Sequence, residues 1–302
     1  MPRHPSLRKL GMVTDAVWAD IDGDKDADLV VVGEWMPVTI FINDGGILTK
    51  VENTDNGLQY SDGWWQSIEI SDLDKDGDMD FILGNMGFNY KFKATATAPL
   101  ELYYGNFDGN NTLDIAMGYY ENGKLYPVYE WSQAAQQTSD IRDLIKSNNQ
   151  YSISTLQEIY GPEFIEKASK LQAFTLATSI LKNSGNGKFD LLPMPNEVQI
   201  SAINSILIKD IDMDGNDDLL LAGNFYPMEV RSIRNDAGIG AFLKGNGKGD
   251  FTFVPNRGAG LFLSGDVRHM AAINHDDEYM IVVVKNNDRP QVIKPKLKNP
   301  NP

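Results

Sequence analysis

Short apolar runs alternate with polar, glycine-containing stretches along most of the chain. The runs at residues 29–32 (LVVV) and 219–221 (LLL) are each bounded by glycine, which is typical of buried β-strands. Three further segments, 39–51, 179–192 and 240–254, each have an apolar strand, a turn rich in glycine and asparagine, and a second strand with Phe or Leu, which predicts β-hairpins. The pattern therefore predicts an all-β protein, with one exception.

The exception is the stretch from about residue 131 to residue 171. Ile141, Leu144 and Ile145 recur there at helical spacing, and residues 154–157 (STLQ) have the form of a helix-capping box. We expect a helical insertion over about 131–171, within one of the β-sheet repeats.

Four nine-residue windows share one pattern of oxygen-bearing side chains, and we call them loops 1 to 4. Positions 1, 3, 5 and 9 carry Asp or Asn in every loop, whereas position 2 and the residue after position 9 are apolar. A glycine follows position 9 by four or five residues. A solvated surface loop would explain one acidic run, but it does not explain spacing shared by four. The loops are residues 20–28 (DIDGDKDAD), 72–80 (DLDKDGDMD), 106–114 (NFDGNNTLD) and 210–218 (DIDMDGNDD).

The excess of negative charge lies entirely in these loops. The 302 residues include 42 acidic and 27 basic ones, for a formal net charge of −15, and acidic and basic residues balance outside the loops. So acidic a chain is a poor candidate for binding nucleic acid. The absence of cysteine excludes disulfides, thiolate zinc sites and cysteine nucleophiles. The apolar runs are too short to cross a bilayer, so we expect no transmembrane segment.

Clustered carboxylates repel one another unless a cation neutralises them, and oxygen donors without sulfur or imidazole select calcium or magnesium. Calcium accepts about six to eight oxygens in irregular geometry, which suits alternate side chains plus one carbonyl. We therefore expect up to four Ca²⁺ ions, each held by the side chains at positions 1, 3, 5 and 9 and by the carbonyl of position 7. The predicted ligands are Asp20, Asp22, Asp24, Asp26, Asp28, Asp72, Asp74, Asp76, Asp78, Asp80, Asn106, Asp108, Asn110, Thr112, Asp114, Asp210, Asp212, Asp214, Asn216 and Asp218.

Three further features of the loops bear on the prediction of calcium binding. Glycine at position 4 or 6 of each loop permits the positive φ angles that a chain curling around an ion needs. An EF-hand loop begins similarly, but it requires a glutamate at position 12 and flanking helices, whereas position 12 is apolar here and the flanks are strands. Loop 3 offers two carboxylates among its side-chain ligands, against four in each other loop, so we expect loop 3 to bind calcium most weakly.

The loops resemble those of the FG-GAP/VCBS repeat family, whose calcium-binding blades occur in integrin α-subunit propellers and in cartilage acidic protein-like proteins. The forms D-x-D-G-D-x-x-x-D and D-x-D-x-D-G-x-x-D carry the resemblance. Motifs around them, such as 84–89 (GNMGFN) and 223–226 (GNFY), look like those of large VCBS-repeat proteins of Bacteroidetes-type bacteria.

The resemblance implies a β-propeller over residues 1–293, with about five recognisable blades that could belong to a seven-bladed ring, and a disordered tail over 294–302. The fifth repeat, at 268–293, is eroded. Asn274, Asp276 and Glu278 begin the pattern, but Val282 stands where the last ligand belongs, so we do not count this repeat as a metal site.

The resemblance also implies a calcium-stabilised adhesion or ligand-binding module, not an enzyme, in an extracellular, cell-surface or periplasmic setting. Its ligand would be an unidentified glycan or protein. Residues 1–5 lack the apolar segment of a signal peptide, and we expect the chain to be part of a longer polypeptide. The alternative is a carbohydrate-active enzyme, a polysaccharide lyase or hydrolase on a calcium-containing propeller. Its candidate acid–base residues are Glu34, Glu69, Glu101, Glu130, Glu229 and Arg231.

Several aromatic side chains could stack on sugar rings, although packing between blades is the commoner role of such residues. We expect the adjacent pair Trp64 and Trp65 to be the exposed ones. The candidates are Trp18, Trp35, Trp64, Trp65, Tyr103, Tyr104, Tyr119 and Tyr120.

Overall fold

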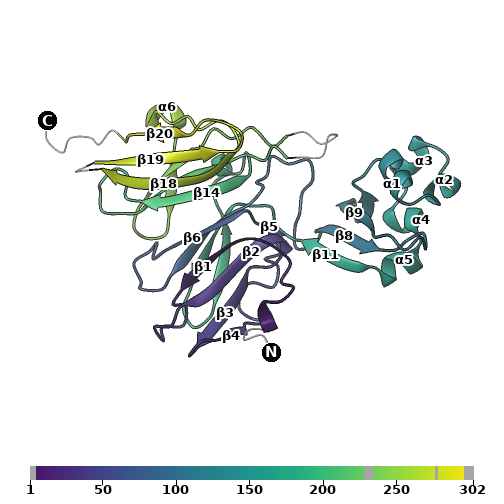
Figure 1. Ribbon diagram of the computed structural model, residues 1–302, viewed down its shortest axis with the longest axis horizontal. Helices are drawn as coiled ribbons and strands as arrows, with labels where there is room; N and C mark the ends of the chain where they lie inside the picture. The colour runs from purple at the N-terminus through teal and green to yellow at the C-terminus, as the bar shows by residue number, and fades with distance from the viewer. Residues whose placement is uncertain (1–4, 228–233, 276–277, 296–302) are drawn as a thin grey trace. The chain divides into compact units, whose positions relative to one another are not determined.

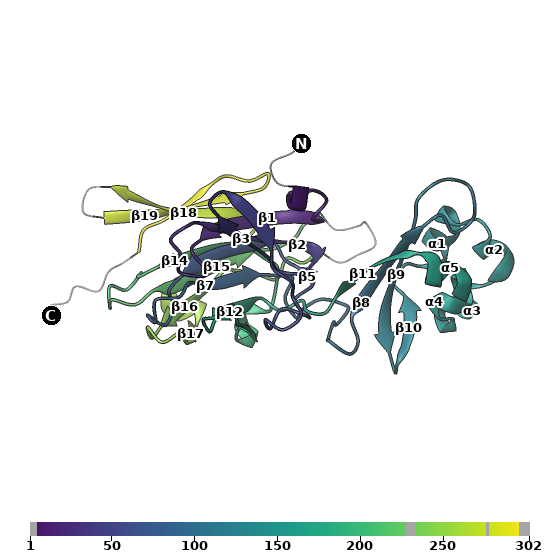
Figure 2. The ribbon, with the colours of Figure 1, turned by 90° about the horizontal axis from the view of Figure 1, so that it is seen from below.

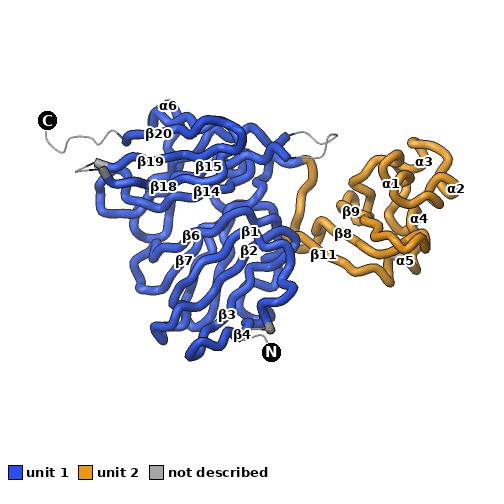
Figure 3. Tube along the Cα trace, viewed as in Figure 1, with its two compact units in different colours: residues 1–90, 176–302 blue, residues 91–175 orange. Residues whose placement is uncertain are grey.

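A computed structural model describes residues 5–227, 234–275 and 278–295. Asp276, the candidate acid–base residues Glu229 and Arg231, and residues 296–302 of the predicted tail lie outside this part of the chain. The chain divides into two compact units: unit 1 comprises Met1–Tyr90 and Leu176–Pro302, and unit 2 comprises Lys91–Thr175 (Figure 3).

Unit 1 contains four antiparallel sheets, which follow one another along the chain (Figures 1 and 2). Sheet 1 consists of β1 (Met12–Ala19), β2 (Asp28–Met36), β3 (Thr39–Asp44), β4 (Ile47–Lys50) and the short β5 (Gly63–Trp64), which pairs with β2. Sheet 2 consists of β6 (Ser67–Ser71), β7 (Asp80–Gly84), β12 (Ser179–Asn183) and β13 (Phe189–Pro193). Sheet 4 consists of β14 (Ile203–Lys209), β15 (Asp218–Gly223), β16 (Ala241–Gly245) and β17 (Phe251–Val254). Sheet 5 consists of β18 (Val267–His275), β19 (Glu278–Lys285) and β20 (Gln291–Ile293).

Sheet 2 is interrupted in sequence by the whole of unit 2. Strand β7 pairs with β12, with Leu83 opposite Ser179, although unit 2 lies between these strands in the chain. The two ends of the insertion are joined directly, because the N–H of Gly87 donates to the carbonyl of Leu176 at 2.7 Å. Unit 2 is therefore an insertion at the connection between the second and third strands of sheet 2.

The sheets of unit 1 pack face to face, because side chains along the second strand of a sheet point alternately to its two neighbouring sheets. In β7, Phe81 and Leu83 pack in the cluster shared with sheet 1, whereas Ile82 packs in the cluster shared with sheet 4. In β15, Leu219 joins that second cluster and Leu220 points to sheet 5. Successive side chains of a strand face opposite sides, so a run that is apolar at every position is buried between two neighbouring sheets.

Glycine at the end of the second strand permits close approach of another backbone segment. A Cβ on Gly84 would lie 2.2 Å from the carbonyl oxygen of Ile203, the first residue of β14. A Cβ on Gly223 would lie 1.9 Å from the carbonyl oxygen of Ala202, which precedes β14, the strand that pairs with β15 in the same sheet. Real side chains do not tolerate such distances, which explains the glycine at these two positions.

Unit 2 combines one sheet with five short helices. Its sheet 3 has the strand order β10-β9-β8-β11 and packs on the helices through Tyr103, Ala116, Ile141 and Leu156. The strands are β8 (Leu100–Gly105), β9 (Asp114–Glu121), β10 (Lys124–Pro127) and β11 (Ser169–Ala173). The helices are α1 (Trp131–Gln137), α2 (Ile141–Leu144), α3 (Asn148–Ile153), α4 (Leu156–Tyr160) and α5 (Pro162–Lys167); a sixth, α6 (Asn256–Ala259), belongs to unit 1.

The predicted capping box lies one residue later than its sequence form suggested. Thr155, not Ser154, is the N-cap of α4, and its partner at the third helical position is Glu158 rather than Gln157. The oxygen of Thr155 accepts from the N–H of Glu158 and the Glu158 carboxylate accepts from the N–H of Thr155 at 2.7 Å. Glutamate is the stronger partner because its charged oxygen faces the positive end of the helix.

The prediction of a predominantly β protein is confirmed, and the three predicted hairpins correspond to β3–β4, β12–β13 and β16–β17. The described strands form repeated antiparallel sheets without closing into a ring.

Candidate metal centres

The four acidic loops occupy the same place in four sheets. Each connects the first strand of a two-strand unit to the second: β1 to β2, β6 to β7, β8 to β9 and β14 to β15. The loops are thus flanked by antiparallel strands, and the rejection of an EF-hand is confirmed. Loops 1, 2 and 4 belong to unit 1 and loop 3 to unit 2.

All four loops share one backbone conformation. Positions 4 and 6 have positive φ in every loop, and glycine occupies one of the two positions each time. The other position carries an ordinary side chain: Lys25 (φ 77°), Lys75 (φ 62°), Asn111 (φ 64°) or Met213 (φ 62°). The two left-handed residues curl each loop back on itself, so that side chains at alternate positions face its interior.

The carboxylate at position 9 fastens each loop of unit 1 to its sheet. Asp28 accepts from the N–H of Ile21 at 2.8 Å and from the N–H of Asn43, on β3, at 2.7 Å. Asp80 accepts in the same way from Leu73 at 3.2 Å and from Asn183 at 2.9 Å.

Asp218 repeats the arrangement with Ile211 and Gly245, both at 3.0 Å. All three carboxylates are at most 2 % exposed. Position 9 is therefore a structural clamp between the loop and the third strand, a role that the ligand pattern alone did not indicate.

Loop 3 lacks the second half of this clamp. Asp114 accepts from the N–H of Phe107 at 2.7 Å through Oδ2, but its Oδ1 is buried and has no hydrogen-bond partner among the described residues. In loop 2 the Oδ1 of Asp74 is likewise buried and without such a partner. Buried carboxylate oxygens without a partner are costly, and a cation in the loop would satisfy them.

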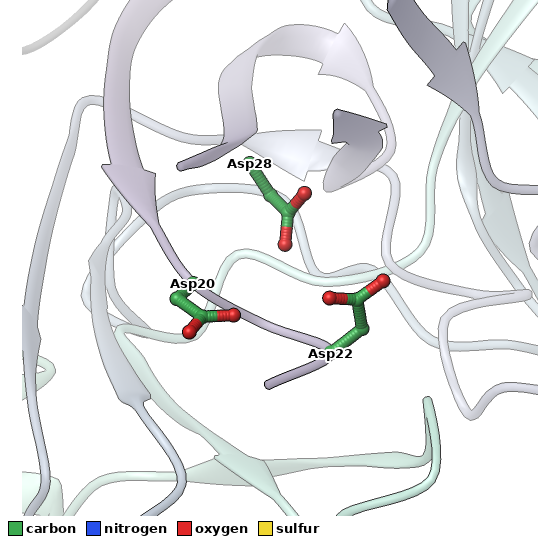
Figure 4. A group of neighbouring side chains, drawn as sticks. All are labelled: Asp20, Asp22 and Asp28. Carbon is green, nitrogen blue, oxygen red and sulfur yellow. The ribbon is translucent and has the colours of Figure 1, made fainter. Parts of the chain in front are cut away.

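Three groups of carboxylates converge in unit 1. Each group offers oxygen atoms that all lie within 4.8 Å of one another, and Figure 4 shows the carboxylates of Asp20, Asp22 and Asp28 turned toward a common space. Three neighbouring oxygens of this kind can form one side of a calcium coordination sphere. The groups are Asp20, Asp22 and Asp28 in loop 1, Asp72, Asp74 and Asp76 in loop 2, and Asp210, Asp212 and Asp218 in loop 4.

The side chains at position 5 make the same hydrogen bond in all four loops. Asp24, Asp76, Asn110 and Asp214, all at position 5, each accept through Oδ1 from the N–H of position 7 at 2.7–2.9 Å. Loop 3 has only two carboxylates, so a triad of acidic residues cannot form within it. Its weaker binding stays a prediction.

Carboxylates at position 1 accept two backbone N–H groups of their own loop. Asp20 accepts from Gly23 and Lys25, and Asp210 accepts from Asp214 and Gly215, at 2.8–3.1 Å. These bonds hold position 1 at the centre of the curled loop, where the predicted ion would lie.

Two lysines that the sequence reasoning missed enter the loops from the third strand. Lys182 Nζ lies 2.6 Å from Asp74 Oδ2, and this hydrogen bond lowers the pKa of Asp74 below its usual value. Lys244 Nζ lies 2.8 Å from Asp214 Oδ2 and also contacts Asp212, and it lowers the pKa of Asp214 in the same way. Loops 2 and 4 therefore contain their own positive charge.

Loop 1 has no lysine at the equivalent place. Leu181 pairs with Phe81, and Phe41 pairs with Leu29, so the residue that corresponds to Lys182 in sheet 1 is Ile42. The difference was present in the sequence, in the first strand of each hairpin, but the equivalent positions can be identified only once the strand register is known.

Burial raises the pKa of the position-9 carboxyls in three loops. The pKa of Asp80 is raised from 3.8 to about 6, because the loss of water outweighs the hydrogen bonds from Asn183 and Leu73. Burial also raises the pKa of Asp114 and Asp218. A divalent cation would favour the charged form at each of these sites.

The expectation of an exposed pair at Trp64 and Trp65 is wrong. Trp65 is completely buried between sheets 1 and 2, and its indole N–H donates to the carbonyl of Ser61 at 2.8 Å. Trp64 is half-buried and packs edge-on against Trp35, with ring centroids 5.1 Å apart. Trp18, on the edge strand β1, is the exposed tryptophan, at 58 %.

Comparison with known protein families supports the resemblance over part of the chain. Residues 20–83 match the family model of the FG-GAP-like repeat, a stretch that begins at the first residue of loop 1 and ends in β7, after loop 2. No curated protein matches the chain. Among the described residues, none of the helices combines the length and the apolar character that crossing a membrane requires.

Proposed function

We propose that this chain is a calcium-stabilised β-propeller module that binds a glycan or protein ligand in an extracellular, cell-surface or periplasmic setting. The observation that carries the proposal is the identical curl of four acidic loops, two of which fall within the matched FG-GAP-like repeat. Repeats of this family occur in extracellular proteins and typically serve in binding rather than in catalysis.

The residues present fit calcium. Every predicted ligand is an oxygen donor, three loops gather three carboxylates within 4.8 Å, and buried oxygens of Asp74 and Asp114 lack a hydrogen-bond partner among the described residues. Such donors favour a hard cation, and millimolar extracellular calcium matches affinities of about 10⁻⁴–10⁻³ M. A bound ion would supply the charge that the loops lack and hold each hairpin against its sheet.

The propeller is part of the same proposal. Four sheets of unit 1 pack face to face in the order 1, 2, 4 and 5, with β1 beside β6, β6 beside β14 and β14 beside β18. Stacked blades of this kind continue until the first and last sheets meet. We propose that they belong to a ring of up to seven blades, completed within a longer polypeptide.

Two of the carboxylates considered for an enzyme, Glu34 and Glu101, have structural partners. Glu101 is buried and accepts from the Tyr103 hydroxyl at 2.5 Å and from Gln172 at 2.8 Å. Glu34 accepts from Gln66 at 2.9 Å. These contacts support binding over acid–base catalysis as the function we propose.

Thermal unfolding in excess EDTA and in millimolar calcium tests the proposal. A site with a Kd of about 10⁻⁴ M contributes about 2.7 kcal/mol at a hundredfold excess of calcium, so the melting temperature should rise markedly. Asp212→Asn should reduce the rise, whereas Asp236→Asn, at an exposed aspartate outside the loops, should leave it unchanged. Equal melting temperatures with and without calcium would contradict the structural role of the ion.

A further inference from the structure

An aromatic cavity lies within unit 2. Its volume is about 460 Å³, which falls in the range of about 300–1,000 Å³ typical of small-molecule sites. The β9–β10 hairpin, the segment after it, and helices α1 and α3 build its wall. Its aromatic lining consists of Tyr119, Tyr126, Tyr129, Trp131 and Tyr151.

Two rings of the hairpin stand side by side in the wall. Tyr119 and Tyr126 are paired residues of β9 and β10, and their ring centroids lie 6.4 Å apart at an angle of 41°. Both residues are half-buried, so part of each remains accessible to solvent. Such surfaces combine an apolar face with a polar edge.

Two further donors of the lining have no hydrogen-bond partner among the described residues. They are the hydroxyl of Tyr151, a residue only 4 % exposed, and the indole N–H of Trp131. Burial raises the pKa of Tyr151, so its hydroxyl remains a protonated donor. Buried donors of this kind are rarely left unpaired, but both atoms have almost no accessible surface, so a ligand in the cavity meets the rings and the rim rather than these donors.

The rim of the cavity is polar and carries little charge. Glu130, Asn148 and Ser152 line it and are exposed. Among the described lining residues Glu130 is the only charged one, so nothing there would balance a phosphate, sulfate or carboxylate group. Hydroxyl, amide and carboxylate groups offer both donors and acceptors, which suits the hydroxyl groups of a neutral ligand.

We propose that this cavity binds a pyranose ring of a neutral glycan. The apolar C–H face of the sugar lies on Tyr119 and Tyr126, and its hydroxyl groups bond the polar rim. The inference deepens the proposed binding function, on which it rests, by naming the ligand class. A compact cavity bounded by a hairpin and two helices suits a ring better than it suits an extended proline-rich peptide, the other ligand of aromatic surfaces.

A glycan array of neutral and acidic oligosaccharides, with a parallel array of proline-rich peptides, tests this with the full chain in calcium. The best neutral glycan is then titrated by ¹⁹F NMR into protein labelled with 5-fluorotryptophan. Trp131 is the only tryptophan of unit 2, so its resonance reports on the cavity alone. We expect that resonance to shift, and Tyr126→Ala and Asn148→Ala to weaken binding about tenfold or more.

Trp18→Ala, which removes an exposed tryptophan of unit 1, is the matched control and should bind normally. Tyr126 is half-buried on an edge strand and Asn148 is exposed, so the loss of either should leave the fold intact, which an unchanged melting temperature would verify. The proposal is overturned if neutral glycans do not bind, if only acidic glycans or proline-rich peptides bind, or if both cavity variants bind as wild type does. If calcium did not raise the melting temperature, the glycan-binding measurements would still test the cavity. The calcium proposal and the glycan proposal can therefore fail separately.

Discussion

Asp80 should make the stability of the metal-free protein rise as the pH falls, opposite to its behaviour with calcium. The side chain is 2 % exposed, and burial raises its pKa from 3.8 to about 6. Between about pH 4 and pH 6 the folded state therefore keeps a proton that the unfolded state has released. Because the folded state binds more protons there, the free energy of unfolding decreases as the pH rises through this window.

The magnitude follows from the pKa difference. One pKa unit corresponds to about 1.36 kcal/mol, so a shift of about two units destabilises the folded state by about 3 kcal/mol at pH 7. Roughly 1.4 kcal/mol of this is recovered on going from pH 7.5 to pH 5. Below about pH 4.5 the effect is obscured, because Asp74 and Asp214, whose pKa values the lysines lower, lose their ion pairs when they are protonated.

Urea unfolding at several pH values between 5 and 7.5, in excess EDTA and in saturating calcium, measures this effect. In EDTA the free energy of unfolding should increase toward pH 5. In calcium it should decrease, because protons compete with the ion for the same carboxylates. Asp80→Asn removes one titrating group and should reduce the increase in EDTA, with the remainder due to Asp114 and Asp218, whose pKa burial also raises, whereas Asp236→Asn should preserve the full increase. The same increase in wild type and Asp80→Asn, or none in wild type, would refute the assignment.

Three further outcomes are expected from the loops. Met213→Gly should stabilise the protein by about 1 kcal/mol in thermal or urea unfolding, because Met213 is 60 % exposed and has positive φ, whereas Asn111→Gly should be nearly neutral since asparagine tolerates that conformation. Ile42→Lys should weaken calcium binding by loop 1 and Lys244→Met should strengthen it in loop 4, as calorimetric titration would show; unchanged affinities would mean that the third-strand lysines do not compete with the ion. Asp108→Ala should abolish the weakest calcium site, and loss of the tightest site instead would reverse the predicted ranking.

The loops and hairpins were predictable because their signals are local. Alternating oxygen donors, a glycine at a left-handed position and an apolar residue on either side specify a curled loop between two strands, whatever the rest of the chain does. The structure adds that position 9 binds the third strand. That contact depends on the register of β2 with β3, or of β7 with β12, which no local pattern shows.

The placement of unit 2 was not predictable from the same signals. In sequence the hairpin β12–β13 follows the sheet that contains loop 3, yet it completes the sheet that contains loop 2. Short apolar strands resemble one another, so pairing across an insertion is decided by tertiary packing rather than by strand composition. The error at Trp65 has a related cause. Trp64 ends the short strand β5 and Trp65 follows it, and consecutive residues at a strand end point to opposite sides, so one of the pair had to point into a core that lies between two sheets.

The connections between the strands of each sheet indicate which end of the sheet is held rigid and which end can vary. In sheets 1, 2 and 4 the loop between the first and second strands has constant length and holds the carboxylates. The connection between the second and third strands varies from the short link before Thr39 to the whole of unit 2. In an antiparallel sheet these two connections lie at opposite ends of the strands. A metal-clamped hairpin fixes one end of each sheet, so the other end can accept an insertion as large as unit 2 without disturbing the strand pairing. Connections at such a free end of a rigid scaffold are where ligand-binding residues vary.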